Sequence, residues 1–327
     1  MVRRKLKPQI QRRVHAREPG LNFRGYPHCG IMTPVPRMSA TSDNSEALGF
    51  SESQKQAILT LLADEDQGVF EQIRDTILER GPAAAEWLQQ YTLDSDPLLR
   101  KRARGIVSHF EQQTADTEFL RFCLSSGEKL SVEEGVWLLA KTGFPEINIA
   151  AYIAVLDEYA EKLKDRIDFG ACSEQMLATI NYFLYHDLGY NGNIANYYDP
   201  ENSYLNRVVD RRTGNPISLC AIYMFVAKRL HLPIAGIGMP DHFLCRFQTS
   251  REEIYIDAFE KGKMLTRGQC TKLLIQRGHD PHDSFLAPIS PRRMLLRICS
   301  NLQHAYTTQD RTEDATRLQR YIVALSK

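Results

Sequence analysis

The stretch from Asn215 to Asp257 constrains the fold more than any other part of this 327-residue chain. Asn215 precedes Pro216, and this pair combines a good helix-capping residue with one that suits the first helical position. Apolar residues then recur at helical spacing as far as His231, which predicts a helix with a buried face. Three short runs of β-type residues follow, at 234–239, 242–247 and 253–257. Turn residues separate these runs, as they separate antiparallel strands, so we expect an α+β fold.

Helical patterns lie on both sides of this stretch. Residues 46–168 have helical periodicity throughout, and the segment that begins at Asp96 weakly resembles half of a HEAT-type helical hairpin. Helical patterns resume at 265–277, 291–307 and 313–325. Between Asp187 and Asp210 the chain is rich in turn formers and aromatic residues, which predicts a long loop that is ordered and packed.

The first 38 residues carry nine basic residues and one acidic residue, although the whole chain has a formal net charge of +1. They lack apolar periodicity and the interleaved aromatic residues of nucleic-acid-binding arms. We expect residues 1–45 to be a disordered basic tail, in which 1–37 are an extension or sequence upstream of a native start at Met38. No stretch reaches the roughly 18 apolar residues of a membrane span. We therefore expect a soluble protein with neither a nucleic acid nor a membrane as its partner.

The seven cysteines are scattered and never form a Cys-x-x-Cys pair. This pattern argues against a disulfide framework and a structural zinc site, and it favours buried thiols in a reducing cytoplasm. The run from His279 to Asp283 holds two histidines and two aspartates and so suggests a metal site, but it is contiguous and has no cysteine or distant carboxylate paired with it. Phosphate-binding and dinucleotide motifs are also absent from the sequence. We expect no metal and no cofactor.

His242 and Asp257 are candidate catalytic residues. A helix followed by strands that carry a histidine and then an aspartate is the arrangement of Cys-His-Asp hydrolases and acyltransferases. A helix N-terminus stabilises the thiolate, the histidine transfers the proton, and the carboxylate fixes the histidine tautomer. Here His242 opens one predicted strand and Asp257 closes the next, so a hairpin would bring them together.

Four short motifs make the region more specific. In chain order they are Asn191-Gly192-Asn193, the run from Tyr198 to Leu205, the run from Arg211 to Leu219, and the run from Gly238 to Leu244. Together they resemble the SirB-type transglutaminase-like family of bacteria. The resemblance implies a papain-like α/β core, and it maps the histidine and aspartate of the family's triad onto His242 and Asp257. It also places the cysteine of the superfamily near Pro216, which carries no nucleophile.

Ser218 and Cys220 are the nearest side chains that could replace this nucleophile. Cys220 lies four residues further into the helix, about 6 Å along its axis, and therefore beyond the first turn, where the helix dipole acts most strongly. It also lies on the apolar face, so a buried core thiol is the alternative interpretation. His242 and Asp257 could likewise form a purely structural hydrogen bond.

These observations predict four parts along the chain. They are a disordered basic tail (1–45), a weakly HEAT-like helical region (46–168), a transglutaminase-like domain (169–290) and a C-terminal helical pair (291–327). We expect the helical region to pack on the transglutaminase-like domain. Asn202 and Arg212 either line a pocket in that domain or pin the long loop to the start of the helix.

Two functions remain open. The first is a non-catalytic interaction module that binds a protein or peptide partner in the cleft beside His242, with Asn202, Arg212 and Ser218 as binding residues. The second is an amide hydrolase or acyltransferase. In that case His242 would be the base, Asp257 would orient it, and Cys220 or Ser218 would be the nucleophile. We favour the first function because Pro216 stands where the nucleophile belongs.

Overall fold

The structure, a computed structural model, describes residues 50–125 and 130–327. All of them lie in one compact unit that runs from Glu46 to Lys327. The disordered tail predicted over 1–45 lies outside the described residues. The described part combines many helices with a four-stranded antiparallel sheet and a two-stranded parallel pair, which confirms the α+β fold.

The N-terminal helices form an apolar cluster of their own. They are α1 (Glu52–Leu62), α2 (Gln67–Arg80), α3 (Pro82–Ala85), the 3₁₀ helix η1 (Glu86–Leu93) and α4 (Pro97–Leu124). Asp66 caps α2 and Asp96 caps α4, each by accepting hydrogen bonds from two backbone N–H groups of the first turn. The cluster takes its buried residues from α1, α2, α3, η1 and the first half of α4. The second half of α4 instead contributes Phe119 and Cys123 to the main core.

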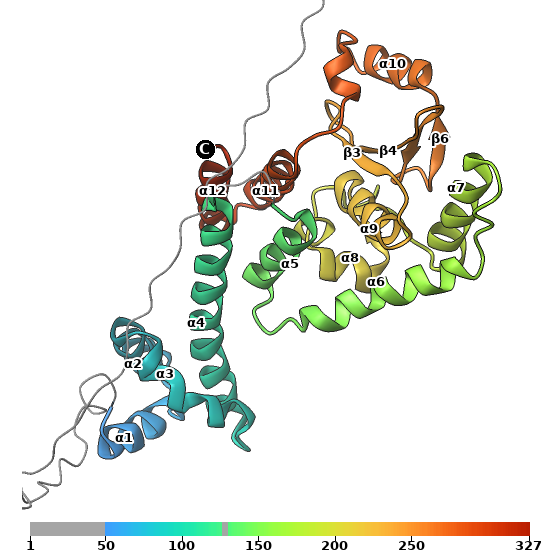
Figure 1. The fold of residues 1–327 in the computed structure, drawn as a ribbon. Coiled ribbons are helices and arrows are strands. Elements are labelled where there is room, and N and C mark those ends of the chain that lie inside the picture. The colour runs from blue at the N-terminus through green and yellow to red at the C-terminus, as the bar shows by residue number, and fades with distance from the viewer. Residues whose placement is uncertain (1–49, 126–129) are drawn as a thin grey trace, which may run out of the picture. The chain divides into compact units, whose positions relative to one another are not determined.

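The antiparallel sheet contains β3 (Ile234–Ile237), β4 (Leu244–Gln248), β5 (Glu253–Asp257) and β6 (Lys263–Leu265), in that order. Successive side chains of a strand point to opposite faces. Leu244 and Tyr255 accordingly join the apolar cluster of α10 (Arg267–Gln276), whereas Cys245 and Ile256 join the main core. Both faces of the sheet are therefore covered, by α10 on one side and by α9 (Pro216–Arg229) on the other (Figure 1).

Two details of this sheet differ from the sequence prediction. His242 does not open a strand, because β4 begins only at Leu244. The backbone of Asp241 is left-handed, with φ of 54°, and the turn that it forms delays the start of β4. The short strand β6 was not predicted, because three residues are too few to show an alternating pattern.

Helix α9 lies at the centre of the main core. Between α4 and α9 come α5 (Val132–Gly143), α6 (Ile149–Lys164), α7 (Ser173–Asn181), the π-helix η2 (Tyr182–Asp187), β1 (Asn191–Gly192), η3 (Pro200–Asn202), α8 (Leu205–Arg211) and β2 (Thr213–Gly214). Helix α6 packs on the side of α9 opposite the sheet (Figure 1). Every residue from Pro216 to Tyr223 is buried. A helix that is apolar on all sides is stable in water only when it is surrounded in this way.

The chain ends in a helical pair that shares this core. After η4 (Asp283–Leu286) come α11 (Pro291–Thr308) and α12 (Thr312–Leu325), which pack on each other. Helix α11 also contacts α5, and α12 contacts α4 (Figure 1). Leu302 and Tyr321 of this pair belong to the same apolar cluster as Trp137 of α5. Among the helices that the structure describes, none has both the length and the apolarity that a bilayer crossing requires.

Candidate functional site

The structure brings His242 and Asp257 into direct contact. His242 Nε2 lies 2.7 Å from Asp257 Oδ2, and both side chains are almost fully buried. The other carboxylate oxygen, Oδ1, accepts hydrogen bonds from the backbone N–H groups of Phe259 at 3.1 Å and Glu260 at 3.2 Å. The carboxylate therefore fixes the turn after β5 and the orientation of the imidazole at the same time.

A cavity of about 550 Å³ opens beside this pair. Its lining includes His242, Asp257 and Pro216, together with the aromatic side chains of Tyr197 and Phe259. The Phe259 ring stands edge-on to the imidazole, with the two ring centres 6.3 Å apart. The start of α9 and the imidazole thus line one cavity, as the two halves of a papain-like site would, and the residue at the helix start is a proline.

The Ser218 side chain forms hydrogen bonds that hold the start of α9. Its backbone N–H donates to Asn215 Oδ1 at 3.0 Å, and the backbone N–H of Asn215 donates to Ser218 Oγ at 3.1 Å, which completes a capping box. The Ser218 hydroxyl itself donates to the carbonyl of Asn202 at 2.7 Å. Ser218 is buried and does not line the cavity. Its hydroxyl acts in capping and in holding the neighbouring loop.

Cys220 is closed off from solvent. Its side chain has no exposed surface, and Sγ lies 3.6 Å from the carbonyl oxygen of Phe243. Burial raises the pKa of the Cys220 thiol well above its ordinary value, and the neighbouring Cys245 thiol raises that pKa further. The thiol remains protonated at neutral pH, and the lining of the cavity does not include it.

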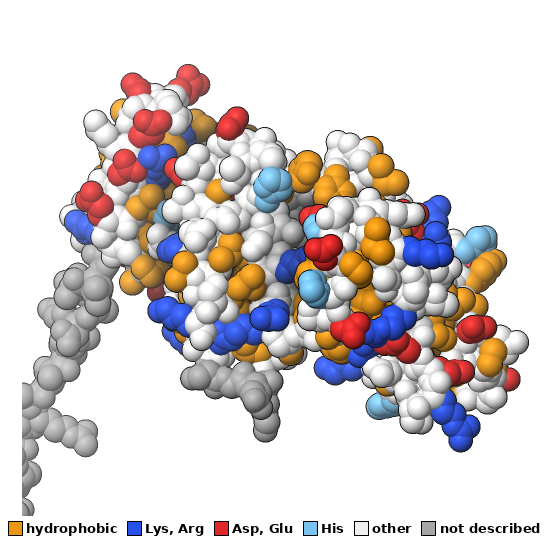
Figure 2. Space-filling view, turned by 90° about the horizontal axis from the view of Figure 1, so that it is seen from above, with side chains coloured by type: hydrophobic (Ala, Val, Ile, Leu, Met, Phe, Trp, Pro, Cys, Tyr) orange, Lys and Arg blue, Asp and Glu red, His pale blue; other side chains and the backbone are white. Residues whose placement is uncertain are grey.

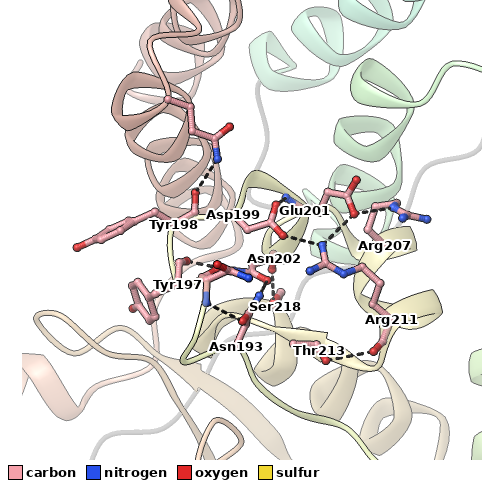
Figure 3. Close-up of polar contacts among 12 residues, drawn as sticks. Asn193, Tyr197, Tyr198, Asp199, Glu201, Asn202, Arg207, Arg211, Thr213 and Ser218 are labelled. Carbon is pink, nitrogen blue, oxygen red and sulfur yellow. Dashed lines mark hydrogen bonds and ion pairs between the residues drawn. The ribbon is translucent and has the colours of Figure 1, made fainter.

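The loop between β1 and α8 is held by side-chain amides at its centre and by ion pairs at one end (Figure 3). Asn202 is 1% exposed, and its Oδ1 accepts from Asn193 Nδ2 at 2.8 Å. Asn202 Nδ2 donates to the carbonyls of Asn196 at 2.8 Å and Tyr197 at 3.1 Å. This network fixes the backbone at Tyr197, whose ring forms one wall of the cavity.

The ion pairs lie at the far end of the same loop. Arg211 Nη1 contacts Asp199 Oδ2 at 2.8 Å and Glu201 Oε2 at 2.9 Å. Arg212 has a left-handed backbone, donates to the carbonyl of Leu188 at 2.7 Å, and lies 5.4 Å from the centre of the Tyr190 ring. The cavity lining contains neither Asn202 nor Arg212. Both side chains instead form hydrogen bonds that hold loops in place.

One part of the cavity lining was not anticipated from the sequence. It is formed by one face of α10 and by β6, and it includes Lys263, Gln269, Lys272, Leu273, Gln276 and Arg277. Helical spacing places Gln269, Lys272 and Gln276 on one face, but nothing in the sequence indicates that this face looks toward His242. His279, from the suspected metal-binding run, instead lies 2.7 Å from Asp241 Oδ2. Within the described residues no group of three or more potential ligands is arranged to hold a metal ion.

Comparison with known proteins places this cavity inside a recognised domain. Residues 150–300 match the family model described as "Transglutaminase-like superfamily". A "UPF0162 protein" of Xylella fastidiosa is 34% identical over 204 residues, which cover 61% of this chain and 73% of that protein. A "UPF0162 protein" of Vibrio cholerae is 27% identical over 180 residues, which cover 54% of this chain and 63% of that protein.

A eukaryotic protein also contains a similar segment. "F-box only protein 21" of Mus musculus is 38% identical over 136 residues, which cover 39% of this chain but only 21% of that protein. No solved structure matches this chain significantly. A segment similar to about two fifths of this chain therefore also occurs as a small part of a longer protein.

Proposed function

The chain belongs to the UPF0162 protein family, and from that premise we propose that its transglutaminase-like domain is a non-catalytic module that binds a peptide segment of a partner protein. The ligand enters the cavity between the start of α9 and the face of α10. Within the superfamily we assign the chain to the SirB type, on the four motifs between Asn191 and Leu244. The recurrence of the segment in a longer eukaryotic protein supports a modular function.

One observation carries this proposal: Pro216 is the α9 residue that lines the cavity together with His242 and Asp257. A proline side chain has no atom that can attack a carbonyl. The two alternative nucleophiles are occupied elsewhere, because Ser218 Oγ donates to a carbonyl at 2.7 Å and the Cys220 thiol is buried against Phe243. A nucleophile must lie within about 3 Å of its general base, and neither side chain lines the cavity that contains the imidazole.

The cysteines also indicate a compartment. The described residues include six free cysteines, five of them buried. Unpaired thiols of this kind persist in reducing compartments. We therefore place the protein in the cytoplasm.

Alkylation of the native protein separates the two functions. We expect iodoacetamide at neutral pH to label Cys172, which is exposed, and to leave Cys220 unlabelled, because burial keeps the Cys220 thiol protonated. Peptide mapping by mass spectrometry reads each cysteine separately, and labelling in denaturant gives the full signal for Cys220. Rapid labelling of native Cys220, faster than that of Cys172, would restore the amide hydrolase or acyltransferase as the function.

A Pro216→Cys variant tests the position of the missing nucleophile directly. The new thiol would lie at the start of a helix and in the same cavity as His242, and both features lower a thiol pKa. We expect iodoacetamide at pH 7 to label it about tenfold faster than the thiol of a Pro291→Cys variant, since more of it is thiolate. Pro291 is the control because it begins α11 at the same helical position but does not line the cavity. It is also less buried than Pro216, so access alone would favour labelling of the control.

The same two variants can also contradict the proposal. Equal labelling rates for Pro216→Cys and Pro291→Cys would mean that the start of α9 does not present its first side chain to the imidazole. The comparison with a catalytic site, and with it the argument that Pro216 stands in the place of a nucleophile, would then fail. Thermal unfolding of both variants shows whether either thiol is exposed by loss of structure.

A further inference from the structure

A second pocket lies among the helices that precede the transglutaminase-like segment. Its volume is about 590 Å³, within the range of roughly 300–1,000 Å³ that is usual for ligand sites. The lining comes from α3, η1, one face of α4, the end of α5 and Pro145. All of the lining residues precede residue 150, where the match to the family model begins. The second pocket is therefore a separate site from the cavity beside His242.

Apolar side chains form much of the lining of this second pocket. Val107 and Phe110 of α4 belong to the buried N-terminal cluster, and Pro82 and Pro145 contribute further apolar surface. Pro82 and Gln89 are exposed, so the pocket is open to solvent on one side. A long side chain that entered from that side would bury its methylene groups against these residues. The second pocket therefore suits a side chain presented by another protein.

The charged side chains of this lining are Glu86, Glu111 and Lys141. Lys141 Nζ lies 2.8 Å from Oε2 of Glu118, which is outside the lining, so the positive charge of Lys141 is already paired. Within residues 50–125 and 130–327, neither Glu86 nor Glu111 forms an ion pair, and the buried Oε2 of Glu111 has no hydrogen-bond partner. The second pocket therefore presents two carboxylates whose charge is not compensated by a described side chain.

The surroundings of Glu111 add to this negative charge. Burial raises the pKa of Glu111 above its ordinary value, and the neighbouring Glu146 raises that pKa further, while Lys141 offsets these effects only in part. Residues 50–125 contain thirteen acidic and eight basic residues. Figure 2 shows several acidic side chains at the end of the molecule that the N-terminal helices form. A field of this sign attracts cationic ligands and repels anionic ones.

We infer that the second pocket binds a lysine or arginine side chain on a segment of a partner protein. The charged head pairs with Glu111 and Glu86, and the methylene stem packs on Phe110 and Pro145. A nucleic acid does not fit, because its phosphates would be repelled by both glutamates. This inference adds a binding surface outside the transglutaminase-like segment and does not rest on the function proposed for the cavity beside His242.

Binding of defined peptides to the full chain tests the inference. The probe is a fluorescein-labelled pentapeptide with a central lysine, a leucine on each side of it and a serine at each end, and fluorescence anisotropy follows its binding. Peptides with glutamine or glutamate in place of the lysine are the comparison probes. We expect the lysine peptide to bind at least about tenfold more tightly than the glutamine peptide, and to weaken as salt rises from about 50 mM to about 500 mM. The glutamate peptide should not bind.

Removal of one carboxylate locates the binding. Glu111→Gln keeps the shape of the side chain and should weaken binding of the lysine peptide about tenfold. It should not lower the unfolding temperature, because it relieves the repulsion from Glu146. Glu86→Gln, at an exposed position, should weaken binding in the same direction. Glu79→Gln is the matched control, since Glu79 is an exposed glutamate of α2 that does not line the second pocket, and it should leave binding unchanged.

Four results would overturn the inference. The first is failure of the lysine peptide to bind, or equal binding of the lysine and glutamine peptides. The second is an equal effect of Glu111→Gln and Glu79→Gln. The third is displacement of the probe by an equal concentration of butylamine, which would identify a small amine as the ligand. The first 38 residues carry nine basic residues, so the probe is also measured on residues 50–327. Binding there at least about tenfold tighter than to the full chain is the fourth result, and it would replace the partner by this chain's own basic segment.

Discussion

Replacing His242 by alanine should lower the free energy of unfolding by about 3 kcal/mol, because it leaves the buried carboxylate of Asp257 without its partner. Both side chains of this pair are about 5% exposed, so water does not readily replace the imidazole. The expected loss lies at the lower end for a broken buried pair, since the backbone N–H groups of Phe259 and Glu260 still hold Asp257 Oδ1. Urea unfolding followed by circular dichroism measures the change.

The chain offers a matched control for this experiment. His279 and Asp241 also form a His–Asp pair at 2.7 Å, but their side chains are 32% and 75% exposed. An exposed pair contributes at most about 1 kcal/mol, so His279→Ala should be nearly neutral. If His242→Ala were no more destabilising than His279→Ala, the buried pair would have no structural function, and a site function would have to explain it.

The expected loss of stability in His242→Ala also limits its use in binding experiments. A His242→Ala protein that binds no partner could have lost the shape of the cavity rather than a contact with the ligand. Lys272→Glu changes the cavity lining at an exposed position and avoids this ambiguity. The two variants together separate a residue that supports the cavity from one that meets the ligand.

Asn202→Ala should be of comparable severity, with a loss of about 3 kcal/mol. The substitution removes three hydrogen bonds at a position that is 1% exposed. It leaves the amide of Asn193 and the carbonyl of Tyr197 without these partners, whereas the carbonyl of Asn196 still accepts from the backbone N–H of Asp199 at 3.1 Å. Each buried polar group left without a hydrogen bond costs about 1–3 kcal/mol. Because Tyr197 lines the cavity, the same variant should also bind a peptide ligand of the cavity weakly.

Two further substitutions sharpen this prediction. Asn202→Asp keeps the acceptor for Asn193 but places a carboxylate oxygen against two carbonyls, so it should not restore stability. Asn191→Ala is the matched control, because Asn191 is only partly buried and its side-chain amide donates at 3.2 Å and 3.5 Å to backbone carbonyls. It should cost less than about 1 kcal/mol. Equal unfolding midpoints for Asn202→Ala and Asn191→Ala would show that the loop does not depend on the Asn202 network.

Local signals in the sequence predicted the central elements well. The pairing of Asn215 with Pro216 marked the start of α9 correctly, because capping depends on a few neighbouring residues. The short β-type runs predicted three of the strands in the sheet, and their antiparallel order followed from the turns between them. The boundary at His242 was wrong by two residues, since a left-handed turn at Asp241 cannot be read from β propensity.

The cavity itself was less predictable. Its walls come from a loop, a helix start, a strand and α10, which are distant in sequence and meet only through packing. Periodicity predicted that residues 265–277 form a helix, but it could not say that Lys272 would line the same cavity as His242. The position of Tyr197 depends on hydrogen bonds to the Asn202 amide, and a sequence pattern does not encode these partners. The proline at the start of α9, by contrast, could be read from the sequence as soon as the helix start was located.

The position of Pro216 has an evolutionary consequence. The first residue of a helix donates no intrahelical hydrogen bond, so proline fits there without disturbing the backbone, and so would many other side chains. Folding therefore places little selection on this one position, although chemistry in a papain-like site depends on it. A change at this one residue can therefore remove a nucleophile from a papain-like fold while the fold itself persists.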